Sequence, residues 1–144
     1  MTATSSLRSS APLPLYEKAA LAAEVVTTYV AARRALRHAG LRDTLAELRR
    51  VESGGARVEL GDPVRAGRRL GRIVTRTLAV LPADGRCLSQ SLVLTRMLAR
   101  RGVQSRLVIA VKPGEQLAAH AWVEYDGVAL LAPGSKNFEE LVTL

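Results

Sequence analysis

The spacing of apolar residues changes once along the chain, close to Gly102. Before this point, apolar side chains recur every three or four residues, which is the period of helices that bury one face. After it, they alternate with other residues or form short runs, which is typical of strands. The turn signals between these runs are Pro113-Gly114, Asp126-Gly127 and Pro133-Gly134. Helices followed by strands predict an α+β fold, in which N-terminal helices pack on a small antiparallel sheet.

We expect four helices, over residues 15–39, 42–51, 63–81 and 87–101. Asp62 and Pro63 mark the start of the third helix, because Asp accepts hydrogen bonds from free amides at a cap and Pro fits the first helical position. The fourth helix has so wide an apolar surface that it is predicted to pack inside the core. We expect strands over residues 106–111, 119–125 and 128–131, in an antiparallel meander with a hairpin at Asp126-Gly127.

Residues 1–14 are rich in Ser, Thr and Pro and are expected to form a flexible tail. Residues 15–144 suit one domain, with a helical part over 15–101 and a sheet part over 105–144. No apolar run has the length of a membrane span or the form of a signal peptide. One cysteine and two histidines argue against a disulfide and a structural zinc site. We therefore expect a cytoplasmic protein with no metal, no cofactor and no membrane partner.

The net charge of +8 is unevenly distributed. Residues 1–86 carry 15 basic and 8 acidic side chains, a net charge of +7, whereas residues 87–144 carry only +1. A basic first half favours an acidic partner. The alternative is that its arginines simply lie on solvent-exposed helix faces. Nucleic acid is not the partner we expect, because aromatic residues make up only 3 % and acidic residues are scattered among the arginines.

Cys87 and His120 are the candidate catalytic pair. Cys87 opens a predicted helix, where free amides, the helix dipole and Arg86 stabilise a thiolate, and where the amides can donate to an oxyanion. His120 lies on a predicted strand, and its imidazole can take the thiol proton and later protonate a leaving amine. One interpretation of Trp122 and Gln90 is that they line the same cleft. The competing interpretation is that these are ordinary core and surface residues.

Four segments carry a pattern that is specific in combination, namely residues 86–92, 98–103, 107–111 and 119–127. The pattern is a cysteine at a helix start, a helix ending in Arg-Arg-Gly-Val, a strand, and His-Ala-Trp-Val-Glu before a turn. Over roughly residues 63–144, the chain resembles the transglutaminase-like lasso peptide biosynthesis B2 proteins. This resemblance implies a transglutaminase-like (papain-like) cysteine protease core.

The resemblance also implies an activity. Such proteins are leader peptidases, which cut the leader from a ribosomally made precursor peptide so that a separate cyclase can close a macrolactam. They usually work with a small leader-binding B1-type protein. Cys87 would be the nucleophile and His120 the base. The alternatives are a non-catalytic docking protein that holds precursor, partner and cyclase together, and a true transglutaminase, which passes the acyl group to an amine.

The third member of the triad departs from the family pattern. The family places an Asp about twelve residues beyond the histidine, and that position falls near Ala132 here. Three other residues can take its place. Asp126 is the nearest downstream acid, although turns use Asp for backbone geometry alone, and Asn137 would serve as in a Cys-His-Asn triad. Glu124 shares the strand face of His120, but we expect it to pair with an arginine. If none of these residues orients His120, a thiolate–imidazolium pair can still form. The alternative is that this protein is a non-catalytic member of the family.

Overall fold

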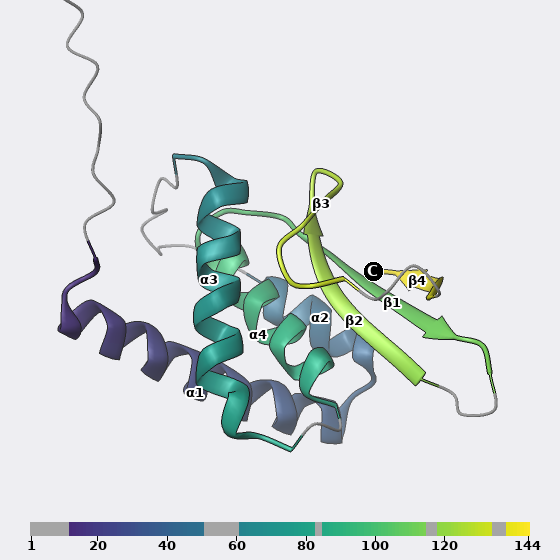
Figure 1. Cartoon of the computed structure of the whole chain (residues 1–144). Coiled ribbons are helices and arrows are strands. Elements are labelled where there is room, and N and C mark those ends of the chain that lie inside the picture. Colours follow the sequence, from purple (N-terminus) through teal and green to yellow (C-terminus); the bar gives the residue numbers. More distant parts are fainter. Residues whose placement is uncertain (1–11, 51–60, 83–84, 115–117, 134–137) are drawn as a thin grey trace, which may run out of the picture.

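The computed structural model describes residues 12–50, 61–82, 85–114, 118–133 and 138–144. The elements in chain order are α1 (Leu15–His38), α2 (Leu41–Arg49), α3 (Pro63–Thr77), the 3-10 turn η1 (Leu78–Val80), α4 (Arg86–Arg100), β1 (Arg106–Lys112), β2 (Ala118–Tyr125), β3 (Val128–Ala129) and β4 (Glu139–Thr143). The helices lie together on one side and the sheet on the other (Figure 1), which confirms the α+β prediction. The predicted tail falls, over residues 1–11, outside the described part of the chain.

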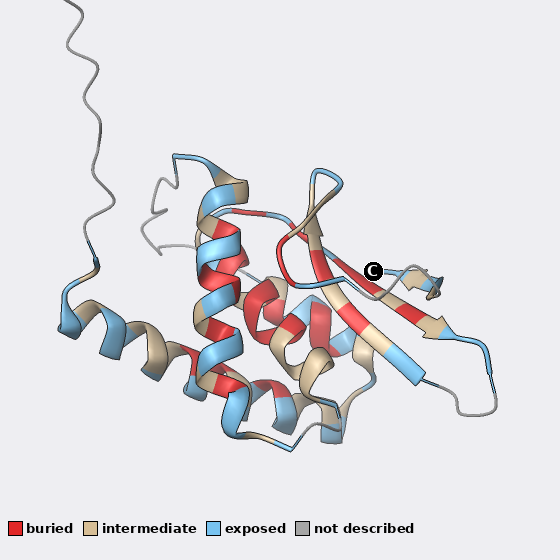
Figure 2. Ribbon diagram, viewed as in Figure 1, coloured by how far each residue is buried: buried red, intermediate tan, exposed pale blue. Residues whose placement is uncertain are grey.

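The helix α4 is the central element, because it packs against α1, α2, α3 and strand β2. Its fully buried side chains include Leu92, Val93, Leu94, Met97 and Leu98. They divide between two core clusters. The first cluster joins α1, α3 and α4 to β2 and residues 130–131, and the second joins α1, α2 and α4 to β1 and β2. Figure 2 shows buried positions along α4, which confirms the prediction of a helix packed inside the core.

Local signals set the starts of two helices. The Asp62 carboxylate accepts hydrogen bonds from the amides of Val64 (3.0 Å) and Arg65 (3.4 Å), and Pro63 is the first residue of α3. This is the predicted cap. Gly85 precedes α4 with a φ of 73°, a left-handed conformation that glycine adopts without strain. A Cβ at Gly85 would meet nothing within 4 Å, so the backbone conformation, and not lack of space, favours glycine there.

The sheet is antiparallel, with the strand order β3-β2-β1-β4. In the pairing of β1 with β2, Ala110 lies opposite His120. Asp126 and Gly127 connect β2 to β3 with φ values of 50° and 75°, which confirms the predicted hairpin turn. The strand β4 pairs with the other edge of β1, a strand that the sequence pattern did not predict. It completes the sheet on the side away from β3.

The strand β3 has two residues rather than the four predicted, because the chain leaves the sheet to pack on α3. Leu130 and Leu131 are buried there, against the two glycines in the middle of the helix. A Cβ at Gly71 would lie 2.5 Å from the Leu130 carbonyl oxygen, and one at Gly67 would lie 2.7 Å from Cδ1 of Leu130. The absence of these two Cβ atoms therefore permits the close approach of residues 130–131 to α3.

Candidate functional site

Cys87 is the second residue of α4, as the sequence predicted. The first amides of a helix have no acceptor within the helix, so they are free to stabilise negative charge near the thiol. The Cys87 side chain is partly buried and packs against the second core cluster, which includes Leu92, Leu107 and Ala121. A nucleophile at this place has oxyanion donors beside it, on a helix fixed by the core.

Arg86 contacts the backbone of the segment that precedes α4. Its Nη2 donates a hydrogen bond to the carbonyl oxygen of Leu81, five residues earlier. This contact joins the start of α4 to the end of the preceding helical segment. Arg86 therefore holds the chain in place around the helix start, and its guanidinium has no hydrogen bond to Cys87.

The ring of His120 is held by one hydrogen bond and two aromatic neighbours. Its centroid lies 5.9 Å from that of Trp122, in a stacked arrangement, and 5.9 Å from that of Phe138, in a tilted one. Its Nε2 atom lies 2.8 Å from the carbonyl oxygen of Ala132. Because a carbonyl oxygen only accepts, Nε2 carries a hydrogen in this contact. In the neutral ring, Nδ1 is therefore the unprotonated nitrogen that can act as a base.

Ala132 is twelve residues beyond His120, where the resemblance to lasso peptide biosynthesis B2 proteins implies an Asp. It contributes its backbone carbonyl, since its side chain has no polar atom. Asp126 lies in the turn at the far end of β2, six residues beyond His120. At the rise of an extended strand, the two Cα atoms are about 20 Å apart. The structure does not bring Asp126 to the imidazole.

The remaining candidates are placed as follows. Glu124 accepts a hydrogen bond of 2.9 Å from Nε1 of Trp122, so it pairs with the indole and not with an arginine. Trp122 stacks on His120 and also packs against the first core cluster, and so it combines both roles considered for it. Gln90 is partly buried near the start of α4. Asn137 lies outside the described residues.

The segments that carry Cys87 and His120 lie together, but their side chains are not hydrogen-bonded. The helix α4 packs on β2, and Ala121, next to His120, belongs to the cluster against which Cys87 packs. Successive strand residues point to opposite faces. Ala121 and Val123 are buried against the helices, so His120 and Trp122 leave the strand on the other face. No hydrogen bond joins the side chains of Cys87 and His120, because Cys87 packs on the helix side of β2 and His120 points to the other side.

Two features of the site had no place in the sequence interpretation. Phe138 is the only phenylalanine of the chain and contacts the His120 ring. Gly67 and Gly71 position the segment that carries Ala132. Their signal was the spacing Gly-x-x-x-Gly within a predicted helix, where each glycine costs about 1 kcal/mol of helix stability relative to alanine and so needs a packing reason.

Over the ranges that the structure describes, no group of three or more His, Cys, Asp and Glu side chains is arranged to hold a metal ion. Within the same ranges, no helix combines the length and the apolar character needed to cross a membrane.

Comparison with known proteins identifies the family. The family model of the transglutaminase-like superfamily matches residues 26–143. The match extends well before residue 63, where the resemblance in the sequence motifs began, and it includes α3 and most of α1. No curated protein and no solved structure matches the chain. A family match over most of the chain, together with the α+β architecture, shows that the protein belongs to the transglutaminase-like superfamily.

Proposed function

We propose that the protein is a cysteine peptidase that removes the leader from a ribosomally made lasso-peptide precursor. The observation that carries the proposal is the contact between His120 Nε2 and the Ala132 carbonyl. It places a hydrogen-bond acceptor on the ring at the position of the missing triad carboxylate and leaves Nδ1 available as a base. Membership of the superfamily supports a Cys-His mechanism.

The reaction would be acyl transfer from a peptide to water. The thiol of Cys87 loses its proton to Nδ1 of His120, and the sulfur attacks the carbonyl carbon of the scissile bond. The amides at the start of α4 donate to the oxygen that becomes negative. The imidazolium returns its proton to the leaving amine as the C–N bond breaks, and water then hydrolyses the thioester. His120 leaves β2 on the face opposite the one that packs on α4, so this mechanism requires the His120 segment to move towards Cys87 when peptide binds.

The partners belong to the same proposal. The resemblance to lasso peptide biosynthesis B2 proteins implies a precursor peptide, a small leader-binding B1-type protein and a macrolactam cyclase, all in the cytoplasm. The basic charge of residues 1–86 supports an acidic peptide or protein among them. The unpaired backbone amides at the start of α4, beside Cys87, also support a peptide substrate, because they can stabilise the oxyanion that forms when the thiolate attacks a peptide carbonyl.

The first test needs no substrate and measures the rate at which iodoacetamide alkylates Cys87 between pH 5 and pH 9. If His120 takes the thiol proton, wild type should be alkylated faster than a protein without this imidazole. His120→Ala should then slow alkylation at pH 6 by about tenfold or more. His38→Ala is the matched control and should leave the profile unchanged. Identical profiles for wild type and His120→Ala would contradict the proposed pair.

The second test is mass spectrometry of a lasso precursor incubated with the protein and its B1-type partner. Cleavage is expected with wild type, and Cys87→Ala should keep the fold and abolish it. A product with a free carboxylate indicates hydrolysis, whereas a product joined to an added amine indicates a transglutaminase. Cleavage by the purified Cys87→Ala variant would end the proposal.

A specific observation favours one alternative, a non-catalytic docking protein of the same complex. His120 has no carboxylate partner among the described residues, and its ring has no hydrogen bond to Cys87. Under this alternative, wild-type protein binds the precursor but does not cleave it, and His120→Ala leaves the alkylation of Cys87 unchanged. The two tests above therefore separate the alternatives.

A further inference from the structure

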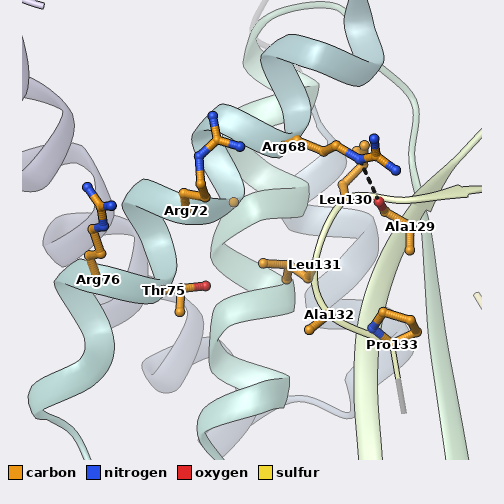
Figure 3. A pocket seen from close by; sticks show the side chains of 10 residues that line it. Arg68, Arg72, Thr75, Arg76, Ala129, Leu130, Leu131, Ala132 and Pro133 are labelled. Carbon is orange, nitrogen blue, oxygen red and sulfur yellow. Dashed lines mark hydrogen bonds between the residues drawn. The ribbon is translucent and has the colours of Figure 1, made fainter. Parts of the chain in front are cut away.

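A groove runs between α3 and residues 129–133, beside the candidate site. It encloses about 570 Å³ and is lined on one wall by Arg68, Gly71, Arg72, Thr75 and Arg76 of α3. The opposite wall is the segment from Ala129 to Pro133. We call this feature the arginine groove (Figure 3). It touches the candidate site directly, because Ala132, in its wall, is the residue whose carbonyl binds His120.

The three arginines of the groove form one row. They recur every four residues, so they lie on one face of α3, about 6 Å apart along the helix axis. Nε of Arg68 donates to the Ala129 carbonyl (3.3 Å), a contact drawn in Figure 3. Arg72 and Arg76 are exposed and have no hydrogen bond or ion pair with any residue in the described ranges. The helix contains no acidic residue to neutralise them.

We propose that the arginine groove binds an extended acidic peptide, and that this peptide is the segment of the substrate that precedes or follows the scissile bond. The second part rests on the proposed peptidase function. Alternate residues of an extended chain point to one side about 6.6 Å apart, close to the spacing of the arginines. Acidic residues at every second position therefore match Arg68, Arg72 and Arg76 one to one. The exposed residues Ala132 and Pro133 supply apolar surface on the opposite wall.

The shape of the groove favours a peptide over nucleic acid. Apart from the arginines and Thr75, its lining consists of glycine and apolar residues, which suits the backbone and small side chains of a peptide. Base-stacking platforms need aromatic rings, and none lines this groove. The wall also ends at the histidine contact, so a peptide that follows it is led towards His120.

The test uses the full chain with Cys87→Ala, so that binding is measured without turnover. Fluorescence anisotropy compares an eight-residue labelled peptide of alternating Glu and Thr with a permuted one, in which the Glu residues are consecutive, and with a Gln-Thr version. The alternating Glu peptide should bind most tightly, and its affinity should fall as salt rises. Arg72→Ala and Arg76→Ala should each weaken binding up to about fivefold. Arg42→Ala, an exposed arginine on α2, is the control and should leave it unchanged.

Three outcomes would overturn the groove proposal. One is that the Gln-Thr peptide binds as tightly as the alternating Glu-Thr peptide. Another is that Arg42→Ala weakens binding as much as Arg72→Ala and Arg76→Ala do. The third is a duplex DNA that displaces the peptide and loses affinity in the same groove variants, which would make the partner a nucleic acid. Failure of catalysis is separable: peptide binding that needs Arg72 and Arg76, in a wild type that never cleaves precursor, supports the groove and contradicts the peptidase proposal.

Discussion

At the scale of single residues, the site depends on how the main chain holds one imidazole. A triad carboxylate would orient the ring and also offset the positive charge that the ring acquires when protonated. The Ala132 carbonyl can orient the ring in the same way, because it too accepts only from Nε2. Its dipole stabilises the imidazolium less than a full negative charge does. We therefore expect a well-ordered base whose catalytic rate is lower than that of a complete triad.

The tautomer of His120 gives a residue-scale prediction. In the neutral ring, two-bond ¹H–¹⁵N correlation spectra should show Nε2 protonated and Nδ1 unprotonated, because the Ala132 carbonyl fixes the hydrogen on Nε2. His38 is exposed at the end of α1 and should show averaging between the two tautomers. A His120 with its hydrogen on Nδ1 would contradict both the contact and the assignment of Nδ1 as the base.

At the scale of elements, α3 supports the site although it carries none of the predicted catalytic residues. Gly67 and Gly71 let residues 130–131 pack directly on the helix, and this fixes the position of the next residue, Ala132. The arginines on the neighbouring face of α3 then border the groove that this contact forms. One helix thus sets both the orientation of His120 and the charge of the adjacent surface.

Alanine substitution at Gly71 tests this coupling. In an ordinary helix, Gly→Ala stabilises by about 0.5–1 kcal/mol. Here the new Cβ would lie 2.5 Å from the Leu130 carbonyl oxygen, so the backbone of residues 130–132 must move. We expect Gly71→Ala to lower the free energy of unfolding by about 1–3 kcal/mol in urea titrations, and to disturb the tautomer spectrum of His120.

Two matched variants control that experiment. Gly61→Ala has open space around its Cβ and should change stability by less than about 0.5 kcal/mol. Gly67→Ala meets the side chain of Leu130 instead of its backbone, so it should leave the His120 spectrum closer to wild type than Gly71→Ala does. A Gly71→Ala protein as stable as wild type, with an unchanged His120 signal, would contradict the coupling.

The sequence predictions succeeded where the interacting residues are close together in the sequence and failed where they are far apart. The Asp62 cap, the Asp126-Gly127 turn and the buried surface of α4 are determined by residues a few positions apart, and the structure has all three. The pairing of β4 with β1 depends on segments about 30 residues apart and has no local signal. The acceptor on His120 is a backbone carbonyl, which every residue has, so no residue type could indicate it.

At the scale of the whole molecule, one ion-pair cluster joins the first helix to the end of the central one. The Glu24 carboxylate of α1 accepts hydrogen bonds from Nη1 and Nη2 of Arg101, at 3.0 and 2.9 Å, and lies 3.5 Å from Nη1 of Arg100. The side chains of Glu24 and Arg101 are only 18 % and 16 % exposed. Such a two-pronged, half-buried pair holds α1 on α4 more firmly than an exposed pair would.

This cluster predicts how stability depends on pH. Burial alone would raise the pKa of Glu24, but the hydrogen bonds and charge of Arg101, with Arg100, outweigh it and bring the pKa below the ordinary value of 4.5. The native state therefore keeps this carboxylate charged at a pH where the unfolded chain is already protonated. The stabilisation is complete above the unfolded pKa and is lost as the pH falls through the lower, native pKa.

Urea unfolding of wild type, Glu24→Gln and Glu47→Gln between pH 7 and pH 2 measures this contribution. Glu24→Gln should lose about 1–3 kcal/mol at pH 7, and its deficit relative to wild type should shrink as the pH falls below about 4, because wild type then loses the same charge. Glu47 pairs with exposed Arg50, so Glu47→Gln should differ from wild type by less than about 0.5 kcal/mol throughout. A Glu24→Gln deficit that stays constant down to pH 2 would mean that packing, and not the charge of Glu24, fastens α1 to α4.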